Sequence, residues 1–242
     1  MKAVLTAINI ILIFCAFCFV NPNIYCKVSD ERYGDIDEFI YRRDFDKAEK
    51  LCKEIIFLNP RDYIAIAQLG EVYWERNNRR KAIKLFKKAV KLNPDYPNAH
   101  FLLGRAYIFQ KKYEKGLGEF DIFKQKMESL SGMDEQTIDY YVAALGYIAY
   151  MHSTLKQYDN VMEECQHILK LRPDDQKAHY NLAICYYLYY HKRNNAYGEL
   201  QKVIEIDPDT YLAKRAKLNI EFMRNNPDSR FMEDFEFIYK DE

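Results

Sequence analysis

Histidine and cysteine side chains, the groups best suited to metal binding or nucleophilic chemistry, are thinly spread along this chain of 242 residues. Two ligands on one helical face must stand three or four residues apart, and none of the five histidines has a histidine or cysteine at that spacing. His167 lies two residues after Cys165, and the CxxC pair Cys15 and Cys18 falls inside a strongly hydrophobic stretch. Glycine-rich phosphate loops and serine-centred nucleophile motifs are missing from the sequence. We therefore expect no catalytic residue, no metal site, no cofactor and no small-molecule substrate, and a protein that is not an enzyme.

The N-terminus differs in character from the rest of the chain, because Ala3–Val20 is apolar and uncharged. Eighteen residues are at the lower edge of what spans a bilayer, and Lys2 favours an N-terminus on the cytosolic side. Small residues at cleavage spacing end at Cys18 and at Cys26, so a cleaved leader and a retained anchor both stay open. A buried core helix is a third interpretation. We expect residues 1–28 to be a signal peptide or membrane anchor, and the protein to lie outside the cytoplasm, in a bacterial periplasm or envelope.

A repeat organises the remainder of the chain. Four similar triplets end in proline, and the prolines are separated by 34, 79 and 35 residues, of which 79 is two units of 34 plus 11. A small or β-branched residue lies twelve positions before each proline. The triplets are Leu58-Asn59-Pro60, Leu92-Asn93-Pro94, Leu171-Arg172-Pro173 and Ile206-Asp207-Pro208.

This pattern resembles the tetratricopeptide-repeat (TPR) family, whose unit is a helix-turn-helix of about 34 residues. The unit that fits best has Ile66, Leu69-Gly70, Tyr73, Ala82, Phe86 and Pro94 at the positions of the family motif. The resemblance implies an all-α solenoid, a right-handed superhelix of about five repeats with C-terminal capping helices. The expected units are 29–62, 63–96, 97–130, 142–175 and 176–208, followed by a capping helix and a short acidic, aromatic helix within 209–242.

The boundaries of the helices carry their own signals. Asp62, Asp95, Asp175 and Asp209 follow the prolines and are candidate N-caps of the next helix. The 11 extra residues amount to about three helical turns, so we expect a break at Ser131–Asp134 and a long helix from about 134 to 155. The last complete unit has one extra residue, which we place in its turn. A capping helix over 210–224 should stop at Asn225-Asn226-Pro227.

Cysteines inside the repeats are interpreted as packing residues. Cys52 and Cys165 stand where other units carry Phe86 and Phe120, so small buried thiols are expected there. Cys165 and Cys185 come from neighbouring units and could approach each other. The sequence leaves open whether they form a disulfide.

The resemblance also implies that the first helix of each pair lines a concave groove that binds peptides. The positions that would face this groove form a row of aromatic residues with few charges, typical of a surface that anchors a partner through apolar side chains. Packing between helices is the alternative for each ring. The groove residues are Tyr33, Trp74, Glu75, Phe101, Arg105, Phe109, Tyr147, Tyr150, Tyr180, Asn181 and Tyr187.

One second helix is strongly basic. This set is either the solvated face of an amphipathic helix or a surface for anionic lipid or an acidic partner. Nucleic acid is not expected as a partner, because Lys+Arg and Asp+Glu both number 36 and the formal net charge is zero. The basic residues are Arg79, Arg80, Lys84, Lys87, Lys88 and Lys91.

These features predict a non-catalytic protein–protein interaction scaffold of the cell envelope. Its partner would be a protein or peptide segment bound in the aromatic groove. The alternative is a regulatory subunit of an enzyme, or of a secretion or assembly complex, carried on another chain.

Overall fold

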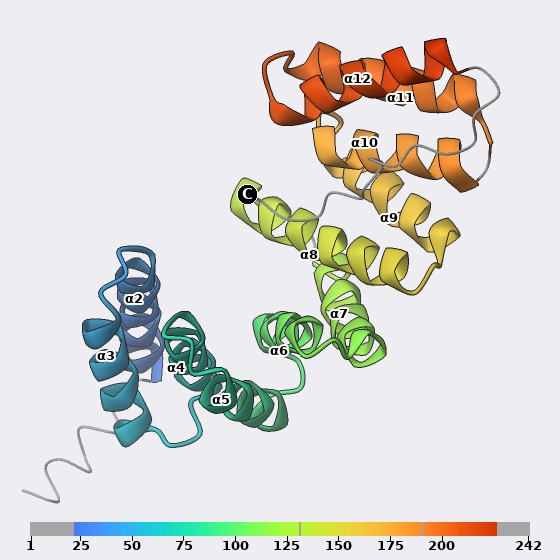
Figure 1. The fold of residues 1–242 in the computed structure, drawn as a ribbon. Helices are drawn as coiled ribbons and strands as arrows, with labels where there is room; N and C mark the ends of the chain where they lie inside the picture. The colour runs from blue at the N-terminus through green and yellow to red at the C-terminus, as the bar shows by residue number, and fades with distance from the viewer. Residues whose placement is uncertain (1–21, 131, 190, 227–242) are drawn as a thin grey trace, which may run out of the picture. The chain divides into compact units, whose positions relative to one another are not determined.

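The computed structural model describes residues 22–226, apart from residues 131 and 190. Eleven α-helices and one π-helical segment, with no strand, make up the regular structure of this described part. The chain divides into two compact units, Met1–Pro94 and Asp95–Glu242. Each unit consists of helices joined by short turns (Figure 1), and each is described below by itself.

Unit 1 contains α2 (Pro22–Tyr41), α3 (Phe45–Leu58), α4 (Tyr63–Glu75) and α5 (Arg79–Leu92). Turns of three or four residues make successive helices antiparallel, and α3 packs on α2 and α4 while α5 packs on α4. Small and branched apolar side chains close the core between them, including Ile36, Ala48, Cys52 and Val72. Helix α2 begins inside the predicted leader, so the predicted boundary after residue 28 lies within a helix. The predicted apolar stretch lies outside the described residues.

Unit 2 contains α6 (Pro97–Phe109), α7 (Tyr113–Glu128), α8 (Glu135–Thr154), α9 (Tyr158–Leu171), α10 (Gln176–Ile184), the π-helix η1 (Cys185–Tyr189), α11 (Arg193–Ile206) and α12 (Tyr211–Asn225). Each odd-numbered helix packs against its predecessor as a hairpin, and α12 covers α11. The predicted acidic, aromatic helix after Pro227 lies outside the described residues.

The turn inside each hairpin repeats the same backbone conformation. One residue per turn has a positive φ: Arg43, Asn77, Lys111, Lys156 and His191. They are 34, 34, 45 and 35 residues apart, so the same turn recurs with the 11-residue and one-residue additions inferred from the prolines. The first addition lengthens α8 to 20 residues, and the Asp134 carboxylate caps this helix by accepting from the Thr137 amide at 2.8 Å. The prediction that the single extra residue lies in the turn was wrong. It is part of η1 at the end of the first helix, where the wider i→i+5 hydrogen bonding accommodates it.

Two of the four predicted caps are confirmed. Asp62 accepts from the Ala65 amide at 2.9 Å, and Asp175 accepts from the Ala178 amide at 2.7 Å. The other two predictions were wrong by one residue. Tyr96 precedes α6, whose first residue is Pro97, and Thr210 caps α12 through its hydroxyl group. The Asp95 carboxylate instead pairs with Lys126 Nζ at 2.5 Å.

Close crossing of two helices explains the glycine of the repeat motif. A Cβ atom added at Gly104 would lie 2.6 Å from ring carbons of Phe120, and one at Gly70 would lie 2.6 Å from Phe86. Gly118, on the exposed face of α7, would meet nothing within 4 Å. The motif glycines therefore allow α6 and α4 to approach the helix that follows each of them.

We expect Gly104→Ala to lower the free energy of unfolding by about 1–3 kcal/mol, because the buried Phe120 ring must shift. The matched Gly118→Ala should raise it by about 0.5–1 kcal/mol through helix propensity alone. Urea unfolding followed by circular dichroism measures both. Equal effects of the two changes would contradict the close-crossing explanation.

Candidate functional site

Four of the predicted groove residues are buried and cannot contact a partner in this structure. Phe101, Tyr180, Asn181 and Tyr187 are all less than 5% exposed. They lie on the sides of their helices that pack against neighbouring helices. The Tyr180 hydroxyl, for example, accepts a hydrogen bond from Asn219 Nδ2 of α12 at 2.9 Å. The groove prediction is corrected for these four residues, whose rings and amide belong to the core.

The predicted groove residues of unit 1 hold structural contacts. The Tyr33 hydroxyl donates to the Asp62 carboxylate at 2.7 Å, which ties α2 to the start of α4. Trp74 is half-buried near the end of α4, with the Arg79 guanidinium 4.0 Å from its ring centroid. Glu75 is exposed beside it. Tyr33 and Trp74 therefore lie toward opposite ends of the helix bundle and do not form one site.

An aromatic cluster in unit 2 has Phe101 at its centre. The Phe101 ring centroid lies 4.2 Å from Tyr140, 5.5 Å from Phe123, 5.6 Å from Phe120 and 6.0 Å from Tyr147. Phe101, Phe120 and Phe123 are buried, whereas Tyr140 and Tyr147 of α8 are half-buried. The three phenylalanine rings are thus the buried part of the cluster, and the two tyrosines form a rim that remains accessible to a partner.

The remaining predicted residues extend this rim. Arg105 of α6 has its guanidinium carbon 5.7 Å from the Phe101 ring centroid, and Phe109 at the end of α6 is 59% exposed. Tyr150 of α8 is half-buried and packs edge-on against Tyr113, with ring centroids 6.2 Å apart. Burial and a hydrogen bond with Tyr150 raise the pKa of Tyr113. Together with the tyrosine rim, these side chains form what we call the α6–α8 aromatic surface: Arg105, Phe109, Tyr140, Tyr147 and Tyr150.

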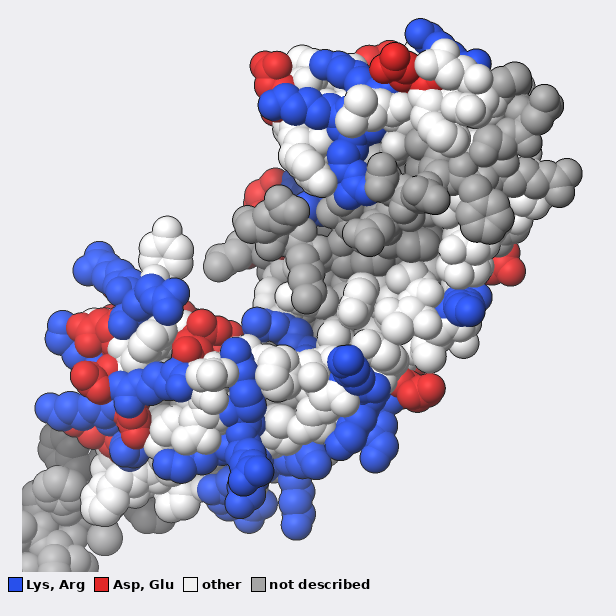
Figure 2. Space-filling view, in the orientation of Figure 1, with Lys and Arg blue, Asp and Glu red and all other residues white. Residues whose placement is uncertain are grey.

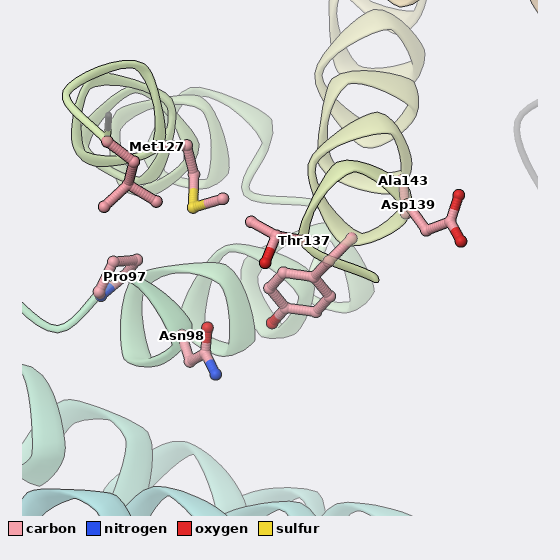
Figure 3. A pocket seen from close by; sticks show the side chains of 8 residues that line it. Pro97, Asn98, Met127, Thr137, Asp139 and Ala143 are labelled. Atoms are coloured by element: carbon pink, nitrogen blue, oxygen red, sulfur yellow. The ribbon is translucent and has the colours of Figure 1, made fainter. Parts of the chain in front are cut away.

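A hollow of about 660 Å³ continues this surface toward the first turns of α6 and α8. Met127 and Thr137 face it in Figure 3, and the Asp139 carboxylate points away from these two side chains. The Asp139 carboxylate accepts from the Arg172 guanidinium at 2.6 Å, so its charge is already paired. The hollow is lined by Pro97, Asn98, Met127, Leu130, Thr137, Asp139, Tyr140 and Ala143.

Sequence reasoning missed this hollow, although one signal pointed to its place. The hollow lies where the 11 additional residues lengthen α8 beyond the start expected for a regular unit. A longer first helix extends past the neighbouring pair and leaves part of its side uncovered. The position of the insertion could therefore have indicated where the surface is hollowed, but not which residues line it.

Of the predicted basic residues on α5, Arg80, Lys84, Lys87, Lys88 and Lys91 are exposed, whereas Arg79 is half-buried against Trp74. This helix carries seven cations and no carboxylate, and three of the cations lie in its first turn, where the helix dipole disfavours positive charge. Figure 2 shows Lys and Arg gathered over α5. Within the described part of the chain, no ion pair neutralises Arg80, Lys84, Lys88 or Lys91.

Three cysteines of the repeats have free thiols. Cys52, Cys165 and Cys185 are buried and form no disulfide with one another. Burial raises the pKa of Cys52 to about 12 and that of Cys185 to about 12, so both remain protonated and unreactive near neutral pH. In residues 22–226, gaps excepted, no group of three or more His, Cys, Asp or Glu side chains could hold a metal ion. The helices of this same part include none that is long and apolar enough to cross a membrane.

Known proteins resemble this chain in its repeats. Residues 70–110 match the family model described as TPR repeat. The DnaJ homolog subfamily C member 7 homolog of Schizosaccharomyces pombe is 30% identical over 87 residues, which cover 36% of this chain and 18% of that protein. A TPR repeat-containing protein of Methanocaldococcus jannaschii is 29% identical over 126 residues, which cover 49% of this chain and 22% of that protein. The chain thus spans about a fifth of the length of these curated relatives.

Among solved structures, MamA from Desulfovibrio magneticus RS-1 is similar, with a TM-score of 0.59 and 17% identity. The likeness covers 75% of this chain and 96% of that one. At this level of identity the comparison speaks for the fold alone. The all-α arrangement of TPR helix pairs is confirmed.

Proposed function

We propose that this chain, a member of the TPR repeat family, is a non-catalytic scaffold that binds a peptide or partner segment on the α6–α8 aromatic surface. One observation carries the proposal: the buried Phe101 cluster supports half-exposed tyrosines beside an open hollow. Rigid aromatic rings with accessible edges provide large contact area at low entropic cost, and they dominate the energetics of many interfaces. Stacked helix pairs commonly present such extended binding surfaces.

The partner segment that fits this surface is apolar or aromatic on one side. Ala143 and Gly146 leave room along α8, because a Cβ atom added at Gly146 would meet nothing within 4 Å. Asn98 is an exposed polar group at the edge of the hollow and could hydrogen-bond to the backbone of a bound segment. A helical or extended segment could therefore place one side chain in the hollow and lie along α8.

The proposal includes a place in the cell. We propose that the protein acts in the cell envelope, directed there by residues 3–20, which hold it at the membrane where this segment is retained. The supporting observation is the apolar, uncharged composition of Ala3–Val20 directly before the folded part. Fractionation of cells that express the full chain tests this part, and recovery in the soluble cytosolic fraction would contradict it.

Capture from native membranes tests the binding surface. We expect the double variant Tyr147→Ala/Tyr150→Ala to lose at least about tenfold in partner retention, since rim aromatics typically contribute one to two kcal/mol each. The matched control is Tyr41→Ala/Tyr211→Ala, which removes two tyrosines that are also exposed but lie elsewhere. Equal retention by both variants would show that the α6–α8 aromatic surface is not the binding site.

A further inference from the structure

One end of unit 1 gathers features that are separated along the sequence. Because successive helices are antiparallel, α3 ends, α4 begins and α5 ends at this end, and α2 begins there too. Gln68 of α4 donates to the Asp37 carboxylate at 2.7 Å and to the Tyr33 carbonyl oxygen at 3.0 Å, which fixes α2 beside α4. We call this part of unit 1, where α3 ends and α4 begins, the α3–α4 end.

Two large apolar side chains are exposed at the α3–α4 end. Phe57 and Leu58, the last residues of α3, are 85% and 61% exposed. Earlier apolar residues of α3, such as Cys52 and Ile55, face the core of unit 1. Adjacent exposed Phe and Leu side chains, unlike single scattered ones, indicate a surface that meets an apolar environment.

Exposed cations also lie at the α3–α4 end, and several ion pairs of unit 1 lie toward the opposite end. Lys84 lies near the middle of α5, its C-terminal half provides Lys87, Lys88 and Lys91, and Arg61 is exposed in the turn between α3 and α4. The ion pairs toward the other end include Glu38–Arg42, Asp44–Lys47 and Glu49–Arg76. Among the cations of α5, Lys84, Lys88 and Lys91 form no ion pair with the described residues.

We infer that the α3–α4 end lies on an anionic membrane surface, with Phe57 and Leu58 in the interface and the α5 lysines against lipid phosphates. This inference rests on the membrane attachment included in the proposed function, and it adds the residues that would make the contact. An acidic protein would explain the lysines but not the exposed apolar pair beside them. A bilayer interface accommodates both, because basic residues bind anionic headgroups while Phe and Leu enter the acyl boundary. The apolar stretch Ala3–Val20 also joins the folded part at the start of α2, which is at this end.

Brominated lipids, which quench tryptophan emission only on close approach, test the inference on the full chain. Phe57→Trp places a reporter at the α3–α4 end, and Leu218→Trp places one at another exposed apolar position, in α12 of unit 2. The wild type, with Trp74 alone, is the baseline. The chain is reconstituted in vesicles of three parts brominated phosphatidylcholine and one part phosphatidylserine. We expect the added emission of Phe57→Trp to be quenched by at least half, and that of Leu218→Trp to be unaffected.

Removal of charge then tests whether the α5 lysines contact lipid phosphates. We expect the added quenching to fall close to baseline when Phe57→Trp is combined with the triple change Lys84→Gln, Lys88→Gln and Lys91→Gln. We expect the same result for Phe57→Trp in 1 M salt, where the Debye length is about 3 Å. The matched control removes Lys47, Lys50 and Lys53 of α3, each of which has a carboxylate partner on its own helix or cap.

The outcomes distinguish membrane attachment through residues 3–20 from membrane contact at the α3–α4 end. If Phe57→Trp is unquenched in chains that sediment with the vesicles, attachment through residues 3–20 stands and the inference about the α3–α4 end is overturned, leaving an acidic protein as the partner of α5. If the chain does not sediment with vesicles at all, both membrane attachment and the inference fail. Partner binding on the α6–α8 aromatic surface is unaffected by either result.

Discussion

Replacing Phe101 by alanine should lower the free energy of unfolding by about 3–5 kcal/mol, whereas the same replacement of Phe109 should lower it by less than about 1 kcal/mol. Both residues belong to α6 and both were predicted to line the groove. Phe101 is 4% exposed and contacts four aromatic rings, so alanine there leaves a cavity at the centre of the cluster. Phe109 is 59% exposed, so truncating its ring removes little buried area.

Urea unfolding of the two variants, followed by circular dichroism, gives the comparison directly. A loss of stability in Phe101→Ala no larger than that in Phe109→Ala would mean that Phe101 lies at the surface, and its role as a groove residue would be restored. Capture experiments give the complementary result, since Phe109→Ala should weaken partner retention while leaving the fold intact. A variant that weakens binding only because it unfolds would be recognised by its circular dichroism.

The hairpins were predictable because their signals are local and periodic. Asp62 and Asp175 cap the helices that the proline spacing places after them, and Gly70 and Gly104 lie at crossings that the motif implies. The caps at Tyr96 and Thr210 were missed by one residue, since Asp95 and Asp209, directly before them, carry side chains that favour the N-cap position. Only the backbone path, fixed by Pro97 in one case, decides between adjacent candidates.

The accessible face of each helix was harder to predict than the helix itself. Burial of Phe101 depends on α8, which the 11-residue addition moved out of the regular pattern. Tyr187 lies in η1, where the extra residue changes the angle between successive side chains and turns this ring into the core. The hollow beside α6 exists because the ends of three helices meet there, and no short stretch of sequence encodes such a meeting.

Two buried histidines, His100 and His179, each lie beside a carboxylate of the following helix. His179 Nδ1 lies 2.6 Å from the Glu199 carboxylate, and Nε2 lies 3.0 Å from the Pro173 carbonyl oxygen. A carbonyl oxygen and an ionised carboxylate only accept hydrogen bonds, so both ring nitrogens of His179 lie against acceptors. His100 repeats the arrangement in the unit 97–130, with Nδ1 2.7 Å from the Glu119 carboxylate. At the repeat position that His100 and His179 occupy, the first helix is therefore joined to the second by a histidine–carboxylate pair instead of an apolar contact.

We expect His179→Leu to lower the free energy of unfolding at pH 7 by about 2–3 kcal/mol, because the largely buried Glu199 carboxylate loses its hydrogen bond with His179. Burial alone would raise the pKa of Glu199, but hydrogen bonds from His179 and Lys202 outweigh burial, and the pKa lies below its ordinary value. A carboxyl group with a lowered pKa stabilises the fold above its ordinary pKa, and this contribution is lost as the pH falls through the folded value. The difference between wild type and His179→Leu should therefore shrink below about pH 4.5, as Glu199 becomes protonated in both proteins.

A double-mutant cycle separates this ion pair from simple packing. Glu199→Leu alone leaves the buried His179 ring without its carboxylate partner, whereas the double variant His179→Leu/Glu199→Leu replaces both polar side chains by apolar groups of similar size. We expect the double variant to be at least as stable as either single variant, with a coupling of about 1–3 kcal/mol at pH 7. Additive losses that do not change between pH 7 and pH 4 would mean that the two side chains act only by filling space. Coupling that disappears in acid would establish that each of these repeats joins its two helices through a charged pair.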